Sequence, residues 1–521
     1  MIFLYGPSGS GKSALGQLLA DHINLPLVDL DQEIVKQSGK AISDIFARQG
    51  ELGFRQIEKS MLNRVLDGKR KVVALGGGTL LDVENRQRAE ENGRVVCLMA
   101  SLDQLLLRLG TESPSRPLLA GDAPLRLQAL LAERQDHYGS FKICVDTNGR
   151  TLDEVAWQVQ VSLGEFYVRG MSEGYAVMVD PGGLETVGER LAELGLGGRV
   201  ALISDTNVAA LYGERVRDSL CASGFTPSLL PIQPGEQHKS LPTVTALWER
   251  FLSLGMERGS TVIALGGGVT GDLAGFAAAT FLRGIPWLVL PTSLLAMVDA
   301  SLGGKTGFDL PEGKNLVGAF YPPRLVLADP LVLKTLPVAE QRAGMAEVLK
   351  AGIVGDPALF ELCARGWGSV TEHMDEIIRR GIAVKVEFIQ TDPYEKGLRA
   401  ALNLGHTVGH ALELSSGYRL SHGEAVAVGM YFEARLSEEL GIAEKGLAQQ
   451  ISLALQSLDL PVSLPDGLSP VAVLEAMRVD KKKAAGDLHF ALPRQIGQVQ
   501  VGVRVSGKDL ECLKGILEES I

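Results

Sequence analysis

The glycine-rich string Gly6-Pro-Ser-Gly-Ser-Gly-Lys12-Ser13, close to the start of the chain, most constrains how the chain can fold. The apolar residues 2–5 before it predict a strand, and the residues from Lys12 onward predict a helix. A strand, a glycine-rich turn and a helix in this order form a phosphate cradle, because backbone N–H groups and the helix dipole favour the same anion. The string therefore predicts an α/β domain that binds a nucleoside triphosphate through Gly9, Ser10, Gly11, Lys12 and Ser13.

Composition narrows the class of protein. A length of 521 residues predicts two or three domains, and a net charge of −11 argues against nucleic acid or an anionic membrane as the main partner. The five cysteines form no C-x-x-C pair, which indicates a reducing compartment and no thiolate metal site. The longest apolar stretch, around 285–298, is broken by Pro291 and falls short of the roughly 20 residues that span a bilayer. We expect a cytoplasmic protein that acts on small molecules.

The pattern of apolar residues divides the chain into three predicted domains. Residues 1–165 alternate short strands with helices from Lys12, over 55–67 and near 152–163, which predicts a parallel sheet covered on both faces. A second α/β set, with a Rossmann-like arrangement, occupies 172–330. Strand signals then fade, and helical periodicity over 337–352, 371–391, 404–416 and 421–440 predicts a mainly α-helical domain over 331–521.

Several polar residues of the first domain could bind the phosphate acceptor. Asp29 and Asp31 end a predicted strand on the phosphate side of the sheet, one suited to Mg²⁺ and one to a substrate hydroxyl. Arg55 and Glu58 are three apart on a helix, a spacing that is also typical of a surface ion pair. Taken singly, arginines such as Arg134 are more often solvated than ligand-bound.

Taken together and in the order in which they follow along the chain, the motifs of the first domain resemble those of shikimate kinase over nearly the whole domain. The matching strings are the phosphate loop, Asp29-Leu-Asp31, IFARQGELGFRQIE, the triple glycine 76–78, SRPLL and ERQDHY. The resemblance implies that Ser13 and Asp29 serve Mg²⁺, that Arg116 reaches over ATP, that Lys12 and Asp31 are catalytic, and that shikimate is bound by Asp31, Arg55, Gly77 and Arg134. The loop itself is closer to that of gluconate kinases, so a gluconate-type kinase is the alternative.

The second domain has a glycine-rich string of its own. Gly266-Gly-Gly-Val-Thr-Gly271-Asp272 follows a predicted strand and contains G-x-G-x-x-G, a weak dinucleotide signal when it stands alone. Asp205, at the end of another strand, could accept ribose hydroxyls. Further polar loops at strand ends contain Pro234, Gly235, Glu236, Lys239, Thr292 and Ser293.

Histidines in the third domain indicate a metal site. His406 and His410 are four apart on one helix face and His422 follows, so three of the eight histidines lie within 17 residues. Because no glutamate follows His406, the carboxylate ligand must come from elsewhere, and Glu347 is the candidate. Glu347, His406 and His422 would suit catalytic Zn²⁺, and His406, His410 and His422 are the alternative set.

Basic residues stand out in this acidic chain and suit an anionic substrate. Any one of them is more often a solvated surface residue, but Lys305 and Lys314 lie among glycines, which favours contact with a phosphate. The set is Arg283, Lys305, Lys314, Lys350, Lys385, Arg399 and Lys481–Lys483.

From about residue 172 to the end the chain resembles 3-dehydroquinate synthase. The long matches are PGEQHKS, GGGVTGDLAGFAAATFLRG, PTSLLAMVDASLGGKTGFDLPEGKNLVGAF, AGMAEVLKAG, GLRAALNLGHTVGHALE, SHGEAVAVGM and DKKKAAGDLHFALP. The resemblance implies zinc or cobalt on Glu347, His406 and His422, and a homodimer formed through this half. It implies NAD contacts from Asp205, Pro234, Gly235, Glu236, Lys239, Gly268, Val269, Thr270, Gly271, Asp272, Thr292, Ser293, Lys305, Lys314, Val332, Leu333, Lys334 and Thr335. It places Arg283, Asp299, Lys305, Lys350, Lys385, Arg399, Asn403 and His410 around the phosphorylated sugar acid.

Together the two resemblances predict a bifunctional enzyme of aromatic biosynthesis. Its substrates would be shikimate with MgATP, and 3-deoxy-D-arabino-heptulosonate 7-phosphate with NAD. The alternatives for the second half are a metal-dependent polyol dehydrogenase or another sugar phosphate cyclase. A further alternative is that the first half is a non-catalytic partner domain, which the intact Lys12, Asp31 and Arg55 argue against.

Overall fold

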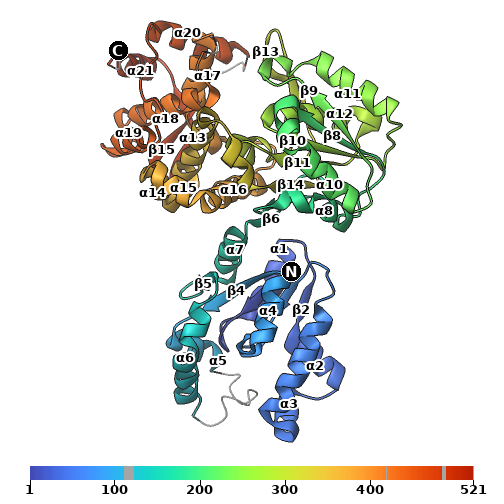
Figure 1. Ribbon diagram of the computed structural model, residues 1–521. Helices are drawn as coiled ribbons and strands as arrows, with labels where there is room; N and C mark the ends of the chain where they lie inside the picture. Colours follow the sequence, from blue (N-terminus) through green and yellow to red (C-terminus); the bar gives the residue numbers. More distant parts are fainter. Residues whose placement is uncertain (111–121, 418, 484–487, 520–521) are drawn as a thin grey trace. The chain divides into compact units, whose positions relative to one another are not determined.

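The computed structural model describes residues 1–110, 122–417, 419–483 and 488–519, with the backbone alone at 123 and 478–483. The chain divides into two units, Met1–Tyr167 and Val168–Ile521 (Figure 1). Strand β6 (Glu165–Val168) spans the boundary between them. No helix among the described residues is long and apolar enough to cross a membrane.

The N-terminal unit is built on a parallel sheet whose central strand buries residues on both sides. The sheet has the order β2-β3-β1-β4-β5, formed by β1 (Ile2–Tyr5), β2 (Leu27–Asp29), β3 (Val72–Ala74), β4 (Arg94–Met99) and β5 (Ile143–Asp146). Phe3 and Tyr5 of β1 join one apolar cluster, while Ile2 and Leu4 join another. Because alternate residues point to opposite faces of a strand, both faces of the sheet are covered by helices.

Helices α1 and α7 contribute to one of these clusters, and α2, α3, α4 and α6 contribute to the other. Their bounds are α1 (Lys12–His22), α2 (Leu30–Ser38), α3 (Ile42–Val65), α4 (Val83–Asn92), α5 (Leu102–Leu109), α6 (Ala123–Gly139) and α7 (Leu152–Leu163). The predicted helix over 55–67 is the second half of α3, which is interrupted at Gly50, where φ is 68°.

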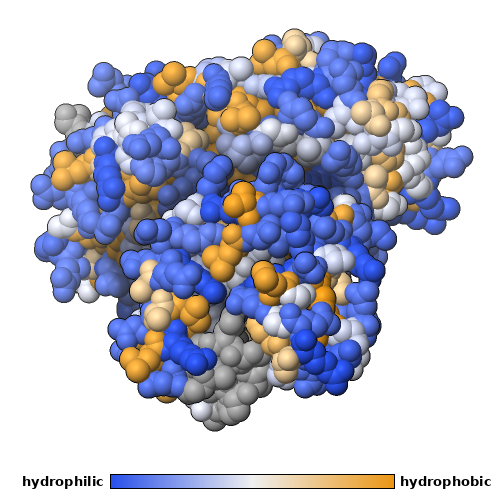
Figure 2. Space-filling model, turned by 60° about the horizontal axis from the view of Figure 1, so that its bottom comes forward, coloured by the Kyte–Doolittle hydropathy of each residue, from blue (hydrophilic) through white to orange (hydrophobic). Residues whose placement is uncertain are grey.

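On the face drawn in Figure 2, hydrophobic side chains lie in small groups between hydrophilic ones.

The C-terminal unit begins with a larger parallel sheet. Its strands run in the order β7-β14-β11-β10-β8-β9, formed by β7 (Tyr175–Val179), β8 (Val200–Asp205), β9 (Pro227–Ile232), β10 (Thr261–Gly266), β11 (Trp287–Pro291) and β14 (Leu325–Ala328). Residues of the central strands β10 and β11 are buried throughout, as expected for a sheet covered on both faces. The accompanying helices are α8 (Val187–Glu193), α9 (Thr206–Val208), α10 (Glu214–Ala222), α11 (Leu241–Ser253) and α12 (Gly268–Thr280).

The rest of this unit is mainly helical, as predicted. The helices are α13 (Val338–Gly355), α14 (Pro357–Ala364), α15 (Trp367–Glu372), α16 (Met374–Thr391), α17 (His406–Ser415), α18 (His422–Glu439), α19 (Leu447–Ser457), α20 (Pro470–Lys483) and α21 (Lys508–Glu518). The predicted helices over 337–352 and 421–440 correspond closely to α13 and α18. The predicted helix over 371–391 is two helices, because α15 ends at Glu372 and α16 begins at Met374.

Two antiparallel hairpins depart from the sequence-based expectation. One joins β12 (Lys305–Leu310) to β13 (Gly313–Phe320), and the other joins β15 (Leu488–Gln495) to β16 (Gln498–Val505). The second hairpin lies within the mainly helical part of the chain and was not predicted. Valines at every second position of β16 carry the period of a strand, and Val505 is buried in the helical core with Phe432 of α18.

Helices α17 and α18 pack so closely that glycine is required between them. A Cβ atom added to Gly429 of α18 would lie 2.0 Å from the carbonyl oxygen of Gly405, whereas one added to Gly515 of α21 would meet nothing within 4 Å. We expect Gly429→Ala to lower the free energy of unfolding by about 1–3 kcal/mol through overpacking. The matched variant Gly515→Ala should raise it by up to about 1 kcal/mol, because alanine favours a helix. Denaturant unfolding followed by circular dichroism checks both, and unchanged stability of Gly429→Ala would contradict this packing.

Candidate active sites

The phosphate loop of the N-terminal unit lies between β1 and α1, as predicted. Gly6 has a φ of 134°, and a Cβ there would lie 2.3 Å from the carbonyl oxygen of Leu98. Gly9 and Gly11 also have positive φ values, of 86° and 91°. Lys12 Nζ donates to the carbonyl oxygens of Gly6 at 2.8 Å and Pro7 at 2.9 Å, so the loop wraps around its own ammonium group. This conformation needs glycine and leaves the N-terminus of α1 facing the loop.

A cavity of about 280 Å³ adjoins this loop. It brings together the four residues predicted to bind shikimate, Asp31, Arg55, Gly77 and Arg134, although they come from four separate segments. Apolar side chains of α3 and α6 line the remaining wall, including Phe54 and Leu131. A polar end and an apolar wall suit a small ring that carries hydroxyl and carboxylate groups.

Glu58 holds Arg55 in this cavity. Arg55 Nη1 donates to Glu58 Oε2 at 2.7 Å, and the Glu58 carboxylate also accepts from Thr79 Oγ1 at 2.6 Å. Glu58 is fully buried, so the alternative of a solvated surface ion pair is wrong. A Cβ at Gly78 would lie 2.4 Å from Arg55 Nη2, so a larger residue there would displace the guanidinium group from this position.

Arg134 offers an unsatisfied donor to the same cavity. Its Nε is buried and has no hydrogen-bond partner among the described residues, and the guanidinium group lines the cavity. Next to it, the hydroxyl of Tyr138 donates to the carbonyl oxygen of Gly77 at 2.9 Å. A cationic group with a buried, unpaired N–H fits an anionic ligand, since leaving such an N–H unpaired is unfavourable.

For two other predicted residues of this site, Asp29 and Arg116, the structure does not test the predicted role. Asp29 lies at the end of β2, where its Oδ1 accepts from the backbone N–H of Gln32 at 3.1 Å and caps α2. Capping uses one oxygen, and a role for Asp29 toward Mg²⁺ stays a prediction. Arg116 lies outside the described residues.

In the C-terminal unit, the glycine turn lies between β10 and α12, and several of the predicted cofactor residues lie around it. A small pocket is lined by Gly268, Gly271, Asp272 and Lys305, among others. Lys239 Nζ pairs with Asp272 at 2.6 Å and donates to Asn315 Oδ1 at the same distance. Burial raises the pKa of Asp272 to about 6, while Lys239 acts to lower it.

The other predicted cofactor residues make different kinds of contact within the unit. The backbone N–H of Thr292 bonds to the carbonyl oxygen of Gly266 at 2.9 Å, which places Thr292 and Ser293 beside the turn. Asp205 caps α9 by accepting from the N–H groups of residues 207 and 208. Val332 and Leu333 are buried, and the Val332 carbonyl accepts from the hydroxyl of Tyr212. Lys314 Nζ lies 3.8 Å from Glu236 Oε1.

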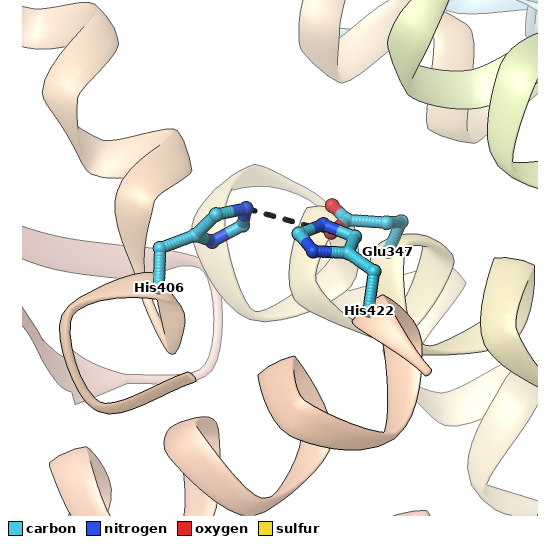
Figure 3. Close-up of side chains that lie close together, drawn as sticks. All are labelled: Glu347, His406 and His422. Carbon is cyan, nitrogen blue, oxygen red and sulfur yellow. Dashed lines mark ion pairs between the residues drawn. The ribbon is translucent and has the colours of Figure 1, made fainter. Parts of the chain in front are cut away.

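Three helices of this unit place a carboxylate and two imidazoles together (Figure 3). Glu347 comes from the middle of α13, while His406 and His422 are the first residues of α17 and α18. Their Nε2 atoms lie 3.7 Å and 3.4 Å from Glu347 Oε1, and the three ligand atoms all lie within 4.8 Å of one another. The Glu347 carboxylate is buried, its Oε2 forms an ion pair with Lys350, and its Oε1 faces the two imidazoles, where it would bind a cation with them.

The alternative set of three histidines is not supported by this geometry. Among the described residues, His406, His410 and His422 do not form a group that could hold a metal, although their rings are neighbours. His410 instead groups with Glu413 and His422. Since both groups use His422, the more buried group with Glu347 is the stronger candidate.

Hydrogen bonds behind the two imidazoles set their orientation. His422 Nδ1 lies 3.4 Å from Glu413 Oε2, and His406 Nδ1 lies 3.2 Å from the carbonyl oxygen of Leu404. Each bond leaves the Nε2 atom facing Glu347. Burial lowers the pKa of His406 to about 3, with Lys350 acting in the same direction. Burial also acts to lower the pKa of His422, but its bonds to Glu347 and Glu413 outweigh it and raise the pKa to about 10.

The predicted substrate cations converge on acidic side chains around this group. Lys350 forms an ion pair with Glu347, Lys385 with Asp299, and Lys305 with Glu395. Asn403 Nδ2 also donates to Glu395 Oε1, at 3.1 Å. Lys350 and Lys385 are buried, so these charges are held away from bulk water.

The remaining basic residues predicted for the substrate are placed as follows. Arg399 is buried, and its Nη1 donates to the carbonyl oxygen of Pro393 at 2.7 Å. Arg283 is exposed in the turn after α12 and forms no ion pair with a described residue. Lys481–Lys483 end α20, where only the backbone is described.

Sequence reasoning missed Glu395 and Glu413 as parts of this site. Glu413 follows His410 by three residues, so a helical spacing could have indicated it. Glu395 carries no such signal, because its partner Lys305 lies 90 residues away in the sequence.

Comparisons with known proteins agree with this architecture. Family models described as 3-dehydroquinate synthase, N-terminal and C-terminal, match residues 229–343 and 344–483, and a model described as shikimate kinase matches residues 8–163. A 3-dehydroquinate synthase from Crocosphaera subtropica is 45% identical over 352 residues, which are 66% of this chain and 96% of that protein.

Solved structures of two cyclases resemble the C-terminal unit. A 2-epi-5-epi-valiolone synthase from Streptomyces hygroscopicus subsp. jinggangensis, with NAD⁺ and Zn²⁺ bound, is 31% identical at a TM-score of 0.61 and covers 68% of this chain and 99% of its own. A 2-deoxy-scyllo-inosose synthase complexed with carbaglucose-6-phosphate, NAD⁺ and Co²⁺ is 27% identical at a TM-score of 0.62, covering 68% and 100%.

The fold and the two sites define a P-loop kinase domain joined to a sugar phosphate cyclase. The chain belongs to the 3-dehydroquinate synthase family and carries a shikimate kinase domain at its N-terminus. The predicted fold class and the predicted pair of enzymes are thereby confirmed.

The two acidic partners of Arg55 provide a matched pair of variants. Glu58→Ala removes a fully buried carboxylate, whereas Glu51→Ala removes a half-exposed one that bonds to Arg55 at 3.1 Å. We expect Glu58→Ala to lower the free energy of unfolding of the N-terminal unit by about 3 kcal/mol, because a buried pair is broken. Glu51→Ala should lower it by less than about 1 kcal/mol. Denaturant unfolding measures both, and equal effects would show that Glu58 is not the buried anchor.

Proposed function

We propose that this chain catalyses two reactions of aromatic biosynthesis. The first unit transfers a phosphoryl group from ATP to shikimate, giving shikimate 3-phosphate. The second converts 3-deoxy-D-arabino-heptulosonate 7-phosphate to 3-dehydroquinate and phosphate. The single observation that carries the proposal is the convergence of Glu347, His406 and His422 with the buried lysines Lys350 and Lys385.

In the kinase site, the chain's residues position two anions and one hydroxyl group. The N–H groups of Gly9–Ser13 and the ammonium of Lys12 hold the triphosphate, and Ser13 and Asp29 hold its Mg²⁺. Arg55 and Arg134 bind the carboxylate of shikimate, because guanidinium groups bind carboxylates through paired hydrogen bonds. Asp31, across the cavity, orients the attacking hydroxyl group and accepts its proton. Positioning and charge neutralisation supply most of the rate in such transfers.

In the synthase site, the residues sort into cofactor, metal and substrate groups. When bound, NAD accepts and returns a hydride, and the metal ion draws electron density from the substrate oxygen. The glycine turn, Asp205, Glu236, Lys239, Lys314 and the segment 332–335 hold the dinucleotide. Glu347, His406 and His422 hold zinc or cobalt.

Cations of the synthase site hold the phosphate that leaves. Lys305, Lys385 and Arg399 bind it; Lys385 and Arg399 are buried, and charges shielded from water act strongly on an anion. Asn403 and His410 bind hydroxyl and phosphate oxygens, and Arg283 and Lys350 add positive charge for the anionic substrate. The oxygens of the leaving phosphate take up the proton lost next to the oxidised carbon.

The alternatives for each half are distinguishable. A polyol dehydrogenase has no use for Lys385 and Arg399, whereas a cyclase that releases phosphate needs them. Release of inorganic phosphate without net formation of NADH from the heptulosonate phosphate supports the synthase and excludes a dehydrogenase. Comparison of shikimate with gluconate in an ADP-coupled assay separates the two kinase assignments.

The proposed function also includes the oligomeric state of the chain and its place in the cell. We propose that the chain acts in the cytoplasm as a homodimer formed through the synthase half, as in the family it resembles. We also propose functional domains at residues 1–165, 172–330 and 331–521.

Reciprocal variants test whether the two activities reside in separate sites. Lys12→Ala should lower kcat for shikimate phosphorylation by about 10²–10³-fold, because an electrostatic contact to the transferred group is lost. His406→Ala should abolish dehydroquinate formation, and each variant should retain the other activity. The controls are Lys36→Ala and His489→Ala, which alter exposed side chains. Undiminished shikimate phosphorylation by Lys12→Ala would overturn the kinase assignment.

Metal removal gives an independent prediction. Dialysis against a chelator, followed by addition of excess Mg²⁺, should leave the kinase active and the synthase inactive, because only the latter uses the Glu347 site. Added Zn²⁺ or Co²⁺ should restore dehydroquinate formation, measured by its absorbance after dehydration. Full synthase activity in metal-depleted protein would contradict the proposed site.

A further inference from the structure

Glu433 is a fully buried carboxylate that the proposed chemistry does not use. It lies on α18, three turns after His422, and none of its surface reaches solvent. Its Oε2 accepts from the backbone N–H of Gly405 at 2.6 Å, and its Oε1 accepts from the N–H of Val408 at 3.2 Å. Burial raises the pKa of Glu433, while the N–H groups that both its oxygens accept from lower it and favour the ionised form. A carboxyl group is unfavourable in such a place unless it has a specific task.

These hydrogen bonds cap the N-terminus of α17 from a neighbouring helix. The first N–H groups of a helix need acceptors from outside it, and a side chain at the N-cap position usually provides one. The N-cap of α17 is Gly405, with a φ of 80° and no side chain. Helix α18 has its own capping box, formed by Ser421 and Glu424. Glu433 therefore supplies what the sequence of α17 lacks.

One peptide group connects Glu433 to a ligand of the proposed metal site. The N–H of Gly405 and the carbonyl of Leu404 belong to the same peptide bond. Glu433 holds its N–H end, and its oxygen lies 3.2 Å from His406 Nδ1. The chain of contacts thus runs from the carboxyl group through a planar peptide to the imidazole, and such linked hydrogen bonds strengthen one another.

Close packing of the two helices leaves this arrangement little freedom. A Cβ atom at Gly405 would lie 2.7 Å from the carbonyl oxygen of Val426, and one at Gly409 would lie 3.1 Å from that of Ala425. Because His406 and His422 are the first residues of α17 and α18, the separation of the two imidazoles depends on how these helices are fixed. Their ring centroids lie 5.3 Å apart.

We propose that Glu433 is a positioning residue that sets the geometry of the metal site, by holding the Leu404–Gly405 peptide that orients His406. The inference rests on the proposed role of Glu347, His406 and His422 as metal ligands. It assigns no contact between Glu433 and the metal or the substrate. Glu413 orients His422 directly, and Glu433 does the equivalent for His406 through the backbone.

The variant Glu433→Gln tests this role in the full-length chain. An amide offers one acceptor in place of two, so its NH₂ group would face the N–H of Gly405 or Val408. We expect the dissociation constant for Zn²⁺, measured by competition with a chromophoric chelator, to rise about 10–100-fold, as for other residues that orient metal-bound histidines. The visible absorption of the Co²⁺-loaded variant should also change at full occupancy, because the position of His406 changes.

A matched control comes from the same helix. Ser437 is also fully buried, and its hydroxyl donates to the carbonyl oxygen of Pro493 at 2.6 Å, away from α17. Ser437→Ala should lower the unfolding temperature but leave the Zn²⁺ dissociation constant within about twofold, since the metal-orienting contacts remain. Shikimate kinase activity of each variant measures the concentration of intact chain independently of the synthase site.

The outcomes separate this inference from the assignment of the site. If His406→Ala weakens zinc binding and Glu433→Gln does not, the positioning role is overturned and the metal site stands. If His406→Ala leaves zinc binding unchanged, the metal site itself is wrong. Should Glu433→Gln fail to fold, Glu433→Asp, which keeps both acceptor oxygens on a shorter stem, should weaken zinc binding, and wild-type affinity would overturn the role.

Discussion

The buried carboxylate of Glu347 places the strongest constraint on the C-terminal unit. Its side chain is 1% exposed, and an ionised group so far from water is tolerated only beside opposite charge or a metal ion. Lys350 from the same helix supplies part of this charge, and two imidazoles from α17 and α18 face its oxygens. Three helices must therefore meet at one point, and the glycines between α17 and α18 permit that approach.

Both units contain the same structural element, a glycine turn between a parallel strand and a helix, but each uses it for different chemistry. In each, a parallel strand ends in glycines and a helix begins where a phosphate group can meet its N-terminus, at Lys12 after β1 and at Gly268 after β10. Each unit then surrounds that turn with its own charged groups. Every residue of the kinase site comes from residues 1–167, and every residue of the synthase site comes from residues 168–521. The two activities therefore depend on separate sets of side chains.

The sequence predicted most of the fold and the residues that gather at the candidate metal site, for physical reasons. Local patterns carry the period of each helix, the glycine turns and the clustered histidines, so Lys12, His406 and His422 could be found without a structure. The pairing of Lys305 with Glu395 spans 90 residues and depends on tertiary packing, which no local pattern encodes. The hairpin of β12 and β13 was missed because its glycines and polar residues look like a loop. Glu433 was missed because glutamate is common on helix surfaces and only burial distinguishes this one.

X-ray absorption at the zinc edge tests the central claim most directly, because it reports the atoms bound to the metal. The account predicts two imidazole nitrogens and one carboxylate oxygen at about 2.0–2.2 Å, with one position left for water or substrate. It also predicts that Glu347→Ala removes the carboxylate contribution and leaves both imidazoles. A first shell with three imidazoles, or one unchanged by loss of Glu347, would contradict it.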